Sequence, residues 1–188
     1  QNYVPAIARL GVVRGLLSGR GWYGSAGWTP GLEEDSVEWR GLRVFEYRWE
    51  WEGERLRVLV EPHSGRVCSL ETRGLGLELW VDRDRPVVGE EFAVYLKLWG
   101  LRGRGLVELR APEGVRLEPR HRVLDLDGGE VTLDFRGTVE KPPERTVLSA
   151  RVEVGNEGYE LGVAVTPVRE VEVGVRPRVV VLPPSGEG

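Results

Sequence analysis

The feature that most constrains the fold of this chain is a two-residue alternation of apolar and polar side chains, repeated in short runs. One run covers residues 92–99, and a longer pair covers residues 148–154 and 159–165, with Gly and Asn between the two. A period of two places one side of a strand in a core and the other in solvent. Seven or eight such runs, separated by turn residues, predict an antiparallel β-sandwich over residues 75–182.

The N-terminal part of the chain shows a different pattern. Residues 37–72 alternate in three runs, centred on 45–51, 56–60 and 67–70, which predicts a three-stranded antiparallel meander with an aromatic face. A sheet of three strands needs a cover on its apolar side. Residues 6–18 supply one, because Ile7, Leu10, Val13 and Leu17 share one face of a short helix.

These patterns divide the chain into three parts. We expect a small, aromatic-rich α+β module over residues 1–73, a β-sandwich with a C-terminal strand over 75–182, and a tail over 183–188. The predicted fold class is therefore mainly β, with an antiparallel sandwich behind one helix on a three-stranded meander.

The turn Glu61-Pro62-His63-Ser64-Gly65-Arg66-Val67, together with the hairpin before it, resembles the repeat of the PepSY family over about residues 6–72. That family usually has Asp where this chain has Glu61. The resemblance implies an extracytoplasmic module of binding or inhibitory type.

A second resemblance covers about residues 76–170. The stretch from Arg85 to Leu98, with the Val107–Leu117 segment after it, resembles prokaryotic extracellular immunoglobulin-like domains. It lacks the Cys-Trp-Cys core of antibody domains, so the resemblance implies the general immunoglobulin-like sandwich and says little about a ligand.

Charge and hydropathy exclude some partners. The net charge is −4 and the two signs are interleaved, so there is no basic field for nucleic acid or anionic lipid. No segment approaches the roughly 20 apolar residues of a membrane-spanning helix. We expect a protein partner, or self-association through a sheet edge, and identify no small-molecule substrate.

The sequence also suggests a compartment and a source. It begins at Gln1 and contains no Met, which is typical of a mature N-terminus after removal of a signal peptide, so we expect an extracellular or cell-envelope protein. Cys68 is the only cysteine, and no internal disulfide can form. Few Asn and Gln residues with abundant alternating charge are typical of a thermophile.

No catalytic, metal or cofactor motif is present in the sequence. His63 and His121 fall among turn and charged residues, where solvent-exposed side chains are the ordinary case. Cys68 is expected to be a buried, inert thiol. Asp125 and Asp127 precede Gly128 as in a calcium loop, but the other ligands at fixed offsets are missing, and only a weak structural calcium site stays open. The sequence predicts no enzyme.

Two segments are candidate interaction sites. The first is a Gly-rich loop with Trp22, Tyr23 and Trp28, which either covers the core of the N-terminal module or forms a contact surface. The second is the apolar run Val179, Val180, Val181 and Leu182, which is either a last strand before a frayed end or a strand that pairs with another chain's sheet edge.

The sequence-based hypothesis is therefore an exported, non-enzymatic structural or interaction protein of the cell surface, such as a filament or surface-assembly subunit. The alternative is an accessory or inhibitory module that docks onto an envelope enzyme or complex through the N-terminal aromatic loop.

Overall fold

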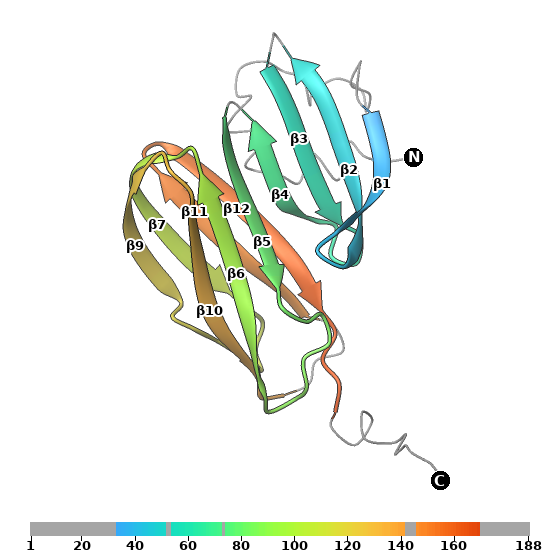
Figure 1. Ribbon diagram of the computed structural model, residues 1–188. Helices are drawn as coiled ribbons and strands as arrows, with labels where there is room; N and C mark the ends of the chain where they lie inside the picture. Colours follow the sequence, from blue (N-terminus) through green and yellow to red (C-terminus); the bar gives the residue numbers. More distant parts are fainter. Residues whose placement is uncertain (1–32, 52–53, 73, 142–145, 170–188) are drawn as a thin grey trace.

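A computed structural model describes residues 33–51, 54–72, 74–141 and 146–169 of the 188-residue chain. The described residues are all β, with two antiparallel sheets (Figure 1). The strands are β1 (Glu33–Trp39), β2 (Leu42–Trp51), β3 (Glu54–Glu61), β4 (Arg66–Thr72), β5 (Leu75–Val81), β6 (Glu91–Trp99), β7 (Arg102–Arg110), β8 (Val115–Glu118), β9 (His121–Asp127), β10 (Val131–Val139), β11 (Thr146–Val154) and β12 (Glu157–Val165).

One sheet has eight strands in the order β1-β2-β3-β4-β5-β6-β10-β8, and the other has four in the order β12-β11-β7-β9. The first five strands of the larger sheet are consecutive hairpins, as short polar turns between alternating runs favour. β4 pairs with β5 through Ser69–Glu78 and Leu70–Leu77, so the sheet is continuous across residue 74. The division of the chain at residues 73–75 remains a prediction, because a continuous sheet is compatible with either one folding unit or two.

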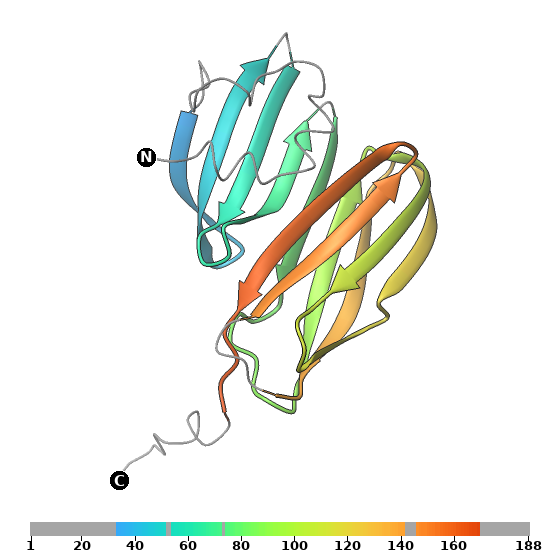
Figure 2. The ribbon, with the colours of Figure 1, turned by 180° about the vertical axis from the view of Figure 1, so that it is seen from behind.

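The core lies between the two sheets, where the alternation places one side of each strand. It combines Leu96 and Phe135 of the larger sheet with Leu148 and Leu161 of the smaller one. Figure 2 shows β12 crossing in front of the larger sheet beside β4 and β5. Tyr47 of β2 belongs to the same core. In the described residues, one side of the meander therefore faces the same core as the sandwich, and its other side carries a separate buried cluster of Val44, Leu59 and Cys68.

The free edge of β12 is tied to the end of β3 by one carboxylate. Glu61 is only 3% exposed, and it accepts hydrogen bonds from the backbone N–H groups of His63 at 2.7 Å and Ser64 at 3.0 Å. It also accepts one from the N–H of Ala164 on β12, at 3.0 Å. One buried side chain thus closes the β3–β4 turn and satisfies an edge donor 103 residues away.

The sequence predictions fare differently. The mainly β sandwich is confirmed, with eight strands in residues 75–165. The meander has four strands instead of three, because residues 33–39 form β1, whose acidic sequence masks the strand pattern. The helix predicted over residues 6–18 lies outside the described residues.

Candidate interaction surfaces

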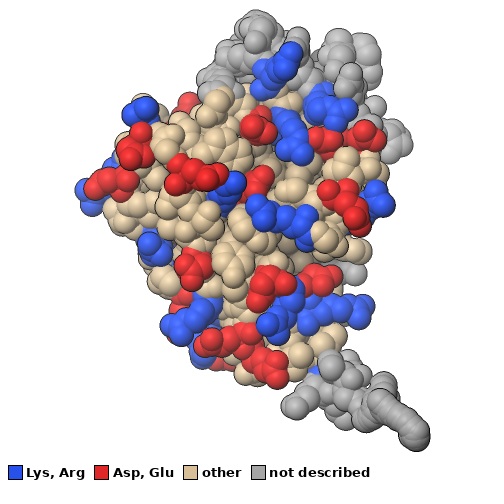
Figure 3. Space-filling view, in the orientation of Figure 1, with Lys and Arg blue, Asp and Glu red and all other residues tan. Residues whose placement is uncertain are grey.

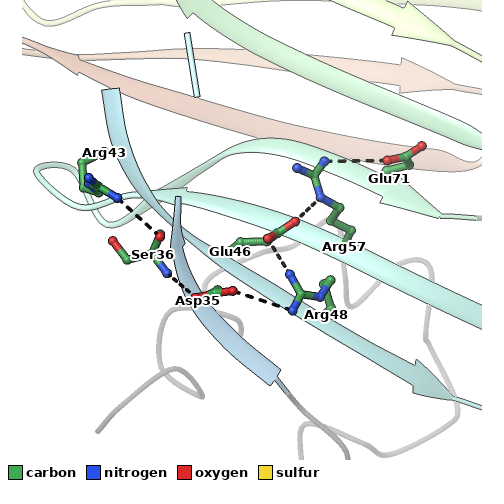
Figure 4. Close-up of polar contacts among 7 residues, drawn as sticks. All are labelled: Asp35, Ser36, Arg43, Glu46, Arg48, Arg57 and Glu71. Atoms are coloured by element: carbon green, nitrogen blue, oxygen red, sulfur yellow. Dashed lines mark hydrogen bonds and ion pairs between the residues drawn. The ribbon is translucent and has the colours of Figure 1, made fainter. Parts of the chain in front are cut away.

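A ladder of charged side chains crosses the outer face of β1–β4 (Figure 4). Glu46 stands at its centre, with Arg48 at 2.5 Å on one side and Arg57 in direct hydrogen-bond contact on the other. Asp35 lies 4.0 Å from Arg48, and Glu71 lies 3.8 Å from Arg57. The signs alternate at every step, so each charge has a neighbour of opposite sign.

This ladder is a structural feature of the sheet. Both oxygens of the Glu46 carboxylate are engaged by guanidinium groups, although Glu46 itself is 7% exposed. A carboxylate held between two guanidinium groups in this way has its position fixed by its partners, which suits a structural role. Networks of this kind support a sheet more than isolated surface pairs do, and especially at high temperature.

The β1–β2 turn carries a second arrangement, around Arg40. Arg40 and Gly41 both have positive φ, 51° and 81°, as a two-residue hairpin turn requires. Arg is a poor residue for that conformation, which costs about 1 kcal/mol or more. Its guanidinium lies 3.4 Å from the centroid of the Trp80 ring and 2.9 Å from the carboxylate of Glu78. These contacts hold the hairpin end against β5.

An aromatic row extends that arrangement over the outer face of β5 and β6. Trp80 stacks on its cross-strand partner Tyr95, with ring centroids 5.4 Å apart. Further along, the indole of Trp99 lies over Gly76, where an added Cβ would sit 1.9 Å from the ring. Lys97 stands beside Trp99 and forms an ion pair with Glu130 at 2.8 Å. The row is half-buried and packs mainly on itself.

The outer face of β7, β9 and β11 carries a shallow groove of about 290 Å³. Leu106 and Val123 are cross-strand partners in its floor, and they are 46% and 55% exposed. Phe45 is the other large apolar side chain that is exposed among the described residues. Polar and charged side chains of β7, β9 and β11 also line the groove, namely Glu108, Arg110, His121, Arg122, Arg151 and Glu153.

The alternation pattern does not predict the groove, although the sequence contains a signal for it. Leu106 shares its face of β7 with Arg104 and Glu108, and Val123 shares its face of β9 with Asp125 and His121. An apolar residue on an otherwise polar face is the pattern to look for. Leu106 and Val123 both lie on the solvent-exposed face of the sheet, where a two-residue alternation predicts polar residues.

The titratable residues singled out from the sequence do not converge on a catalytic arrangement. Cys68 is fully buried in β4, as predicted, and its thiol lies 3.6 Å from the carbonyl oxygen of Leu59. Burial raises the pKa of the Cys68 thiol, and the negative charges of Glu61 and Glu78 add to that effect. A thiol held neutral in this way is a poor nucleophile.

His63 lies exposed in the β3–β4 turn, and His121 lies exposed at the start of β9. Asp127 accepts a hydrogen bond from the N–H of Gly129 at 2.9 Å, which shapes the β9–β10 turn. Within the described ranges, no group of three or more His, Cys, Asp or Glu side chains is placed to hold a metal ion.

The remaining predicted site residues lie outside the described part of the chain. They are Trp22, Tyr23, Trp28, Val179, Val180, Val181 and Leu182. Among the residues that the structure does describe, no helix has the length and hydropathy needed to cross a bilayer. Figure 3 shows positive and negative side chains interleaved over the face in view, without a continuous field of either sign.

Comparisons with known proteins give no family for this chain and do not support the PepSY-like module expected over about residues 6–72. No protein-family model matches it, and no curated protein matches it. Among solved structures, a FixG-related protein from Vibrio parahaemolyticus is similar over 50% of this chain and 96% of its own, with 13% identity and a TM-score of 0.39.

WR4, a member of the C. elegans MSP family, is similar over 48% of this chain and 97% of its own, with 13% identity and a TM-score of 0.38. The cupredoxin domain of amoB from Nitrosocaldus yellowstonii is similar over 48% of this chain and 86% of its own, with 9% identity and a TM-score of 0.36.

Proposed function

We propose that this protein is an exported, non-enzymatic structural or interaction protein of the cell envelope, built on an immunoglobulin-like sandwich, that assembles through its sheet edges. The observation that supports this most is the groove beside β9. There Leu106 and Val123 are exposed next to a strand that ends its sheet. Exposed apolar side chains next to unpaired backbone groups are features of surfaces that bind other chains.

In this proposal, the apolar run at residues 179–182 is the donor that joins one copy to the next. A strand supplied in this way gains backbone hydrogen bonds along an open edge and side-chain contacts on alternate residues. Repeated head-to-tail, such a contact does not close and produces a filament.

The test compares the whole chain with a chain that ends at Pro177, using size-exclusion chromatography with light scattering. We expect the whole chain to form species larger than a dimer at high concentration, and the shortened chain to lose them. Identical sizes together with identical melting curves for the two chains would rule out strand donation by residues 179–182.

The envelope location has its own test, which is detection of the protein in fractionated source cells. Recovery in the envelope or medium supports the proposal, whereas recovery only with cytoplasmic markers contradicts it.

A further inference from the structure

In the part of the chain that the structure describes, the two sheets end in four strands, β1, β8, β9 and β12, and three of these edges are poorly suited to pairing. β12 has the N–H of Ala164 already bound by Glu61. β8 has only four residues and is followed by Pro119. β1 contains acidic residues and no basic ones, so a second β1 would meet like charges. Short strands, prolines and charges are common means of blocking an edge.

β9 is different, because it has seven residues, no proline and charges of both signs. The N–H of Leu109 donates to the carbonyl oxygen of Arg120 at 2.8 Å. Hydrogen-bonded pairs alternate in an antiparallel ladder, so Arg122, Leu124 and Leu126 bond to β7. The N–H and C=O groups of the odd-numbered residues 121–127 therefore point away from β7, toward the free edge.

The geometry points to a second copy of this chain as the occupant of that edge, with two β9 strands pairing antiparallel about a twofold axis at Leu124. A twofold axis perpendicular to the sheet keeps each face on its own side, so odd residues pair with odd residues. Centring on Leu124 pairs Val123 with Asp125 of the other copy and His121 with Asp127. All four outward-pointing residues of each strand then find partners.

Charge disfavours the neighbouring register centred on Asp125, and strand length disfavours the one centred on Val123, which would place Asp127 opposite Pro119, outside β9. His121 and Arg122 lie at the start of β9, while Asp125 and Asp127 lie at its end. An antiparallel partner therefore brings the imidazole end of one strand against the carboxylate end of the other. A shift that centres the axis on Asp125 would place two Asp125 carboxylates opposite each other, which is unfavourable.

The apolar side chains agree with the same register. On the outer face, Val123 of the two copies are diagonal neighbours, with Leu106 beside each, so the exposed pairs merge into one apolar stripe. On the inner face, Leu124 meets Leu124 at the axis. Leu124 and Leu126 pack on the core but are only partly buried in the single chain. A second copy would bury more of their surface.

This inference rests on the proposed function and deepens it, because it names one partner and one edge. A donor strand from residues 179–182 and a second β9 are alternative occupants of the open β9 edge. The two kinds of contact are distinguished by using a full-length chain with Val180→Asp, because a charge in the apolar run 179–182 should prevent it from acting as a donor strand. In that background, a dimer reports on β9 alone.

Sedimentation velocity over a concentration series measures this dimer. We expect the background chain to dimerise and Val123→Pro to remain a monomer at every concentration, because proline removes an outward-pointing N–H and leaves the bonds to β7 intact. Val123→Thr is the matched control, since it keeps the N–H and the branched shape, and it should dimerise like the background chain. Unchanged circular dichroism and melting show that each variant is folded.

A change of side-chain charge tests the same register without removing a backbone hydrogen bond. His121→Asp places carboxylates opposite each other at two symmetric positions, and we expect dimerisation to weaken about tenfold. Adding Asp127→Asn removes the repulsion and retains an oxygen for the N–H of Gly129, so it should recover most of the loss. No weakening by His121→Asp, or no recovery in the double variant, overturns the register.

Cross-linking tests the register directly. Residues facing each other in a non-hydrogen-bonded antiparallel pair have Cα atoms about 4.5 Å apart, within the range of a disulfide. Leu124→Cys should therefore form a covalent dimer under mild oxidation, whereas Asp125→Cys should form much less. Cys68 is buried and does not compete.

A monomeric background chain, or equal cross-linking of both cysteine variants, overturns this inference. The proposed function would still stand if the unmodified chain formed large species through residues 179–182. A β9 dimer that never grows larger in the unmodified chain would instead support the inference and contradict the filament.

Discussion

Glu61 gives the sharpest stability prediction, because one buried carboxylate accepts three backbone hydrogen bonds. In Glu61→Ala, the N–H of Ala164 stays buried and loses its partner, while those of His63 and Ser64 reach water more readily from the turn. Hydrogen bonds to a charged group contribute about 1.5–3 kcal/mol each, and an unpaired buried donor costs about 1–3 kcal/mol. We expect the free energy of unfolding to fall by about 4 kcal/mol.

Two milder substitutions of Glu61 separate its contribution to the turn from its contribution to β12. Glu61→Gln offers one oxygen and turns an NH₂ group toward a donor, so we expect a loss of about 2–3 kcal/mol. Glu61→Asp is one methylene shorter; it should preserve the turn but fail to reach β12. Hydrogen exchange at the Ala164 amide should then accelerate while the amides of the turn change little.

Equilibrium unfolding in guanidinium chloride, followed by tryptophan fluorescence, measures these values. Glu108→Gln is the matched control, because Glu108 is 40% exposed and pairs with Arg110 at 3.3 Å on the surface. That change should stay within about 0.5 kcal/mol of the wild type. The reasoning fails if Glu61→Gln is as mild as the control, or if Glu61→Asp leaves exchange at Ala164 unchanged.

Three further predictions concern single side chains. Arg40→Asn suits the positive φ of the turn but loses the contacts to Trp80 and Glu78. The free energy of unfolding should therefore fall by about 1 kcal/mol, and the tryptophan fluorescence spectrum should change. Unchanged stability would mean that these contacts contribute nothing. Thr146 is fully buried, and its hydroxyl has no hydrogen-bond partner among the described residues, so Thr146→Val should raise the melting temperature and stabilise by about 1 kcal/mol, whereas a loss would reveal a partner. For Cys68, the folded thiol keeps its proton above the pH at which the unfolded thiol, near its ordinary pKa of 9.0, releases one. Stability contributed by this group is thus complete below about pH 9 and falls above it by about 1.4 kcal/mol per pH unit. Cys68→Ala should show a flatter alkaline profile in denaturant titrations from pH 8 to 11, and equal slopes would contradict the assignment.

Much of this fold follows from local patterns. The alternation in β6, β10, β11 and β12 identifies their buried faces correctly, because the side chains on one side of each of these strands meet the core. The same pattern does not predict β1, because its mostly acidic sequence shows little alternation between apolar and polar residues. Its partner β2 provides the pairing, which no local pattern encodes.

The candidate surfaces were harder to predict, because they depend on strand order. Leu106 and Val123 are 17 residues apart and meet only because β7 pairs with β9. From the sequence, Glu61 is an ordinary turn residue; its role depends on β12, whose Ala164 N–H it binds. The open edge of β9 likewise depends on which strands end each sheet, and that is a property of the whole topology.

Concentration-dependent hydrogen exchange of β9 tests the central claim, assembly through an open sheet edge, most directly. At low concentration, the outward-pointing amides of Val123 and Asp125 should exchange rapidly, while that of Leu124, bonded to β7, should exchange slowly. At high concentration, we predict that Val123 and Asp125 become protected and Leu124 does not change. Rapid exchange of Val123 and Asp125 at every concentration would contradict the account.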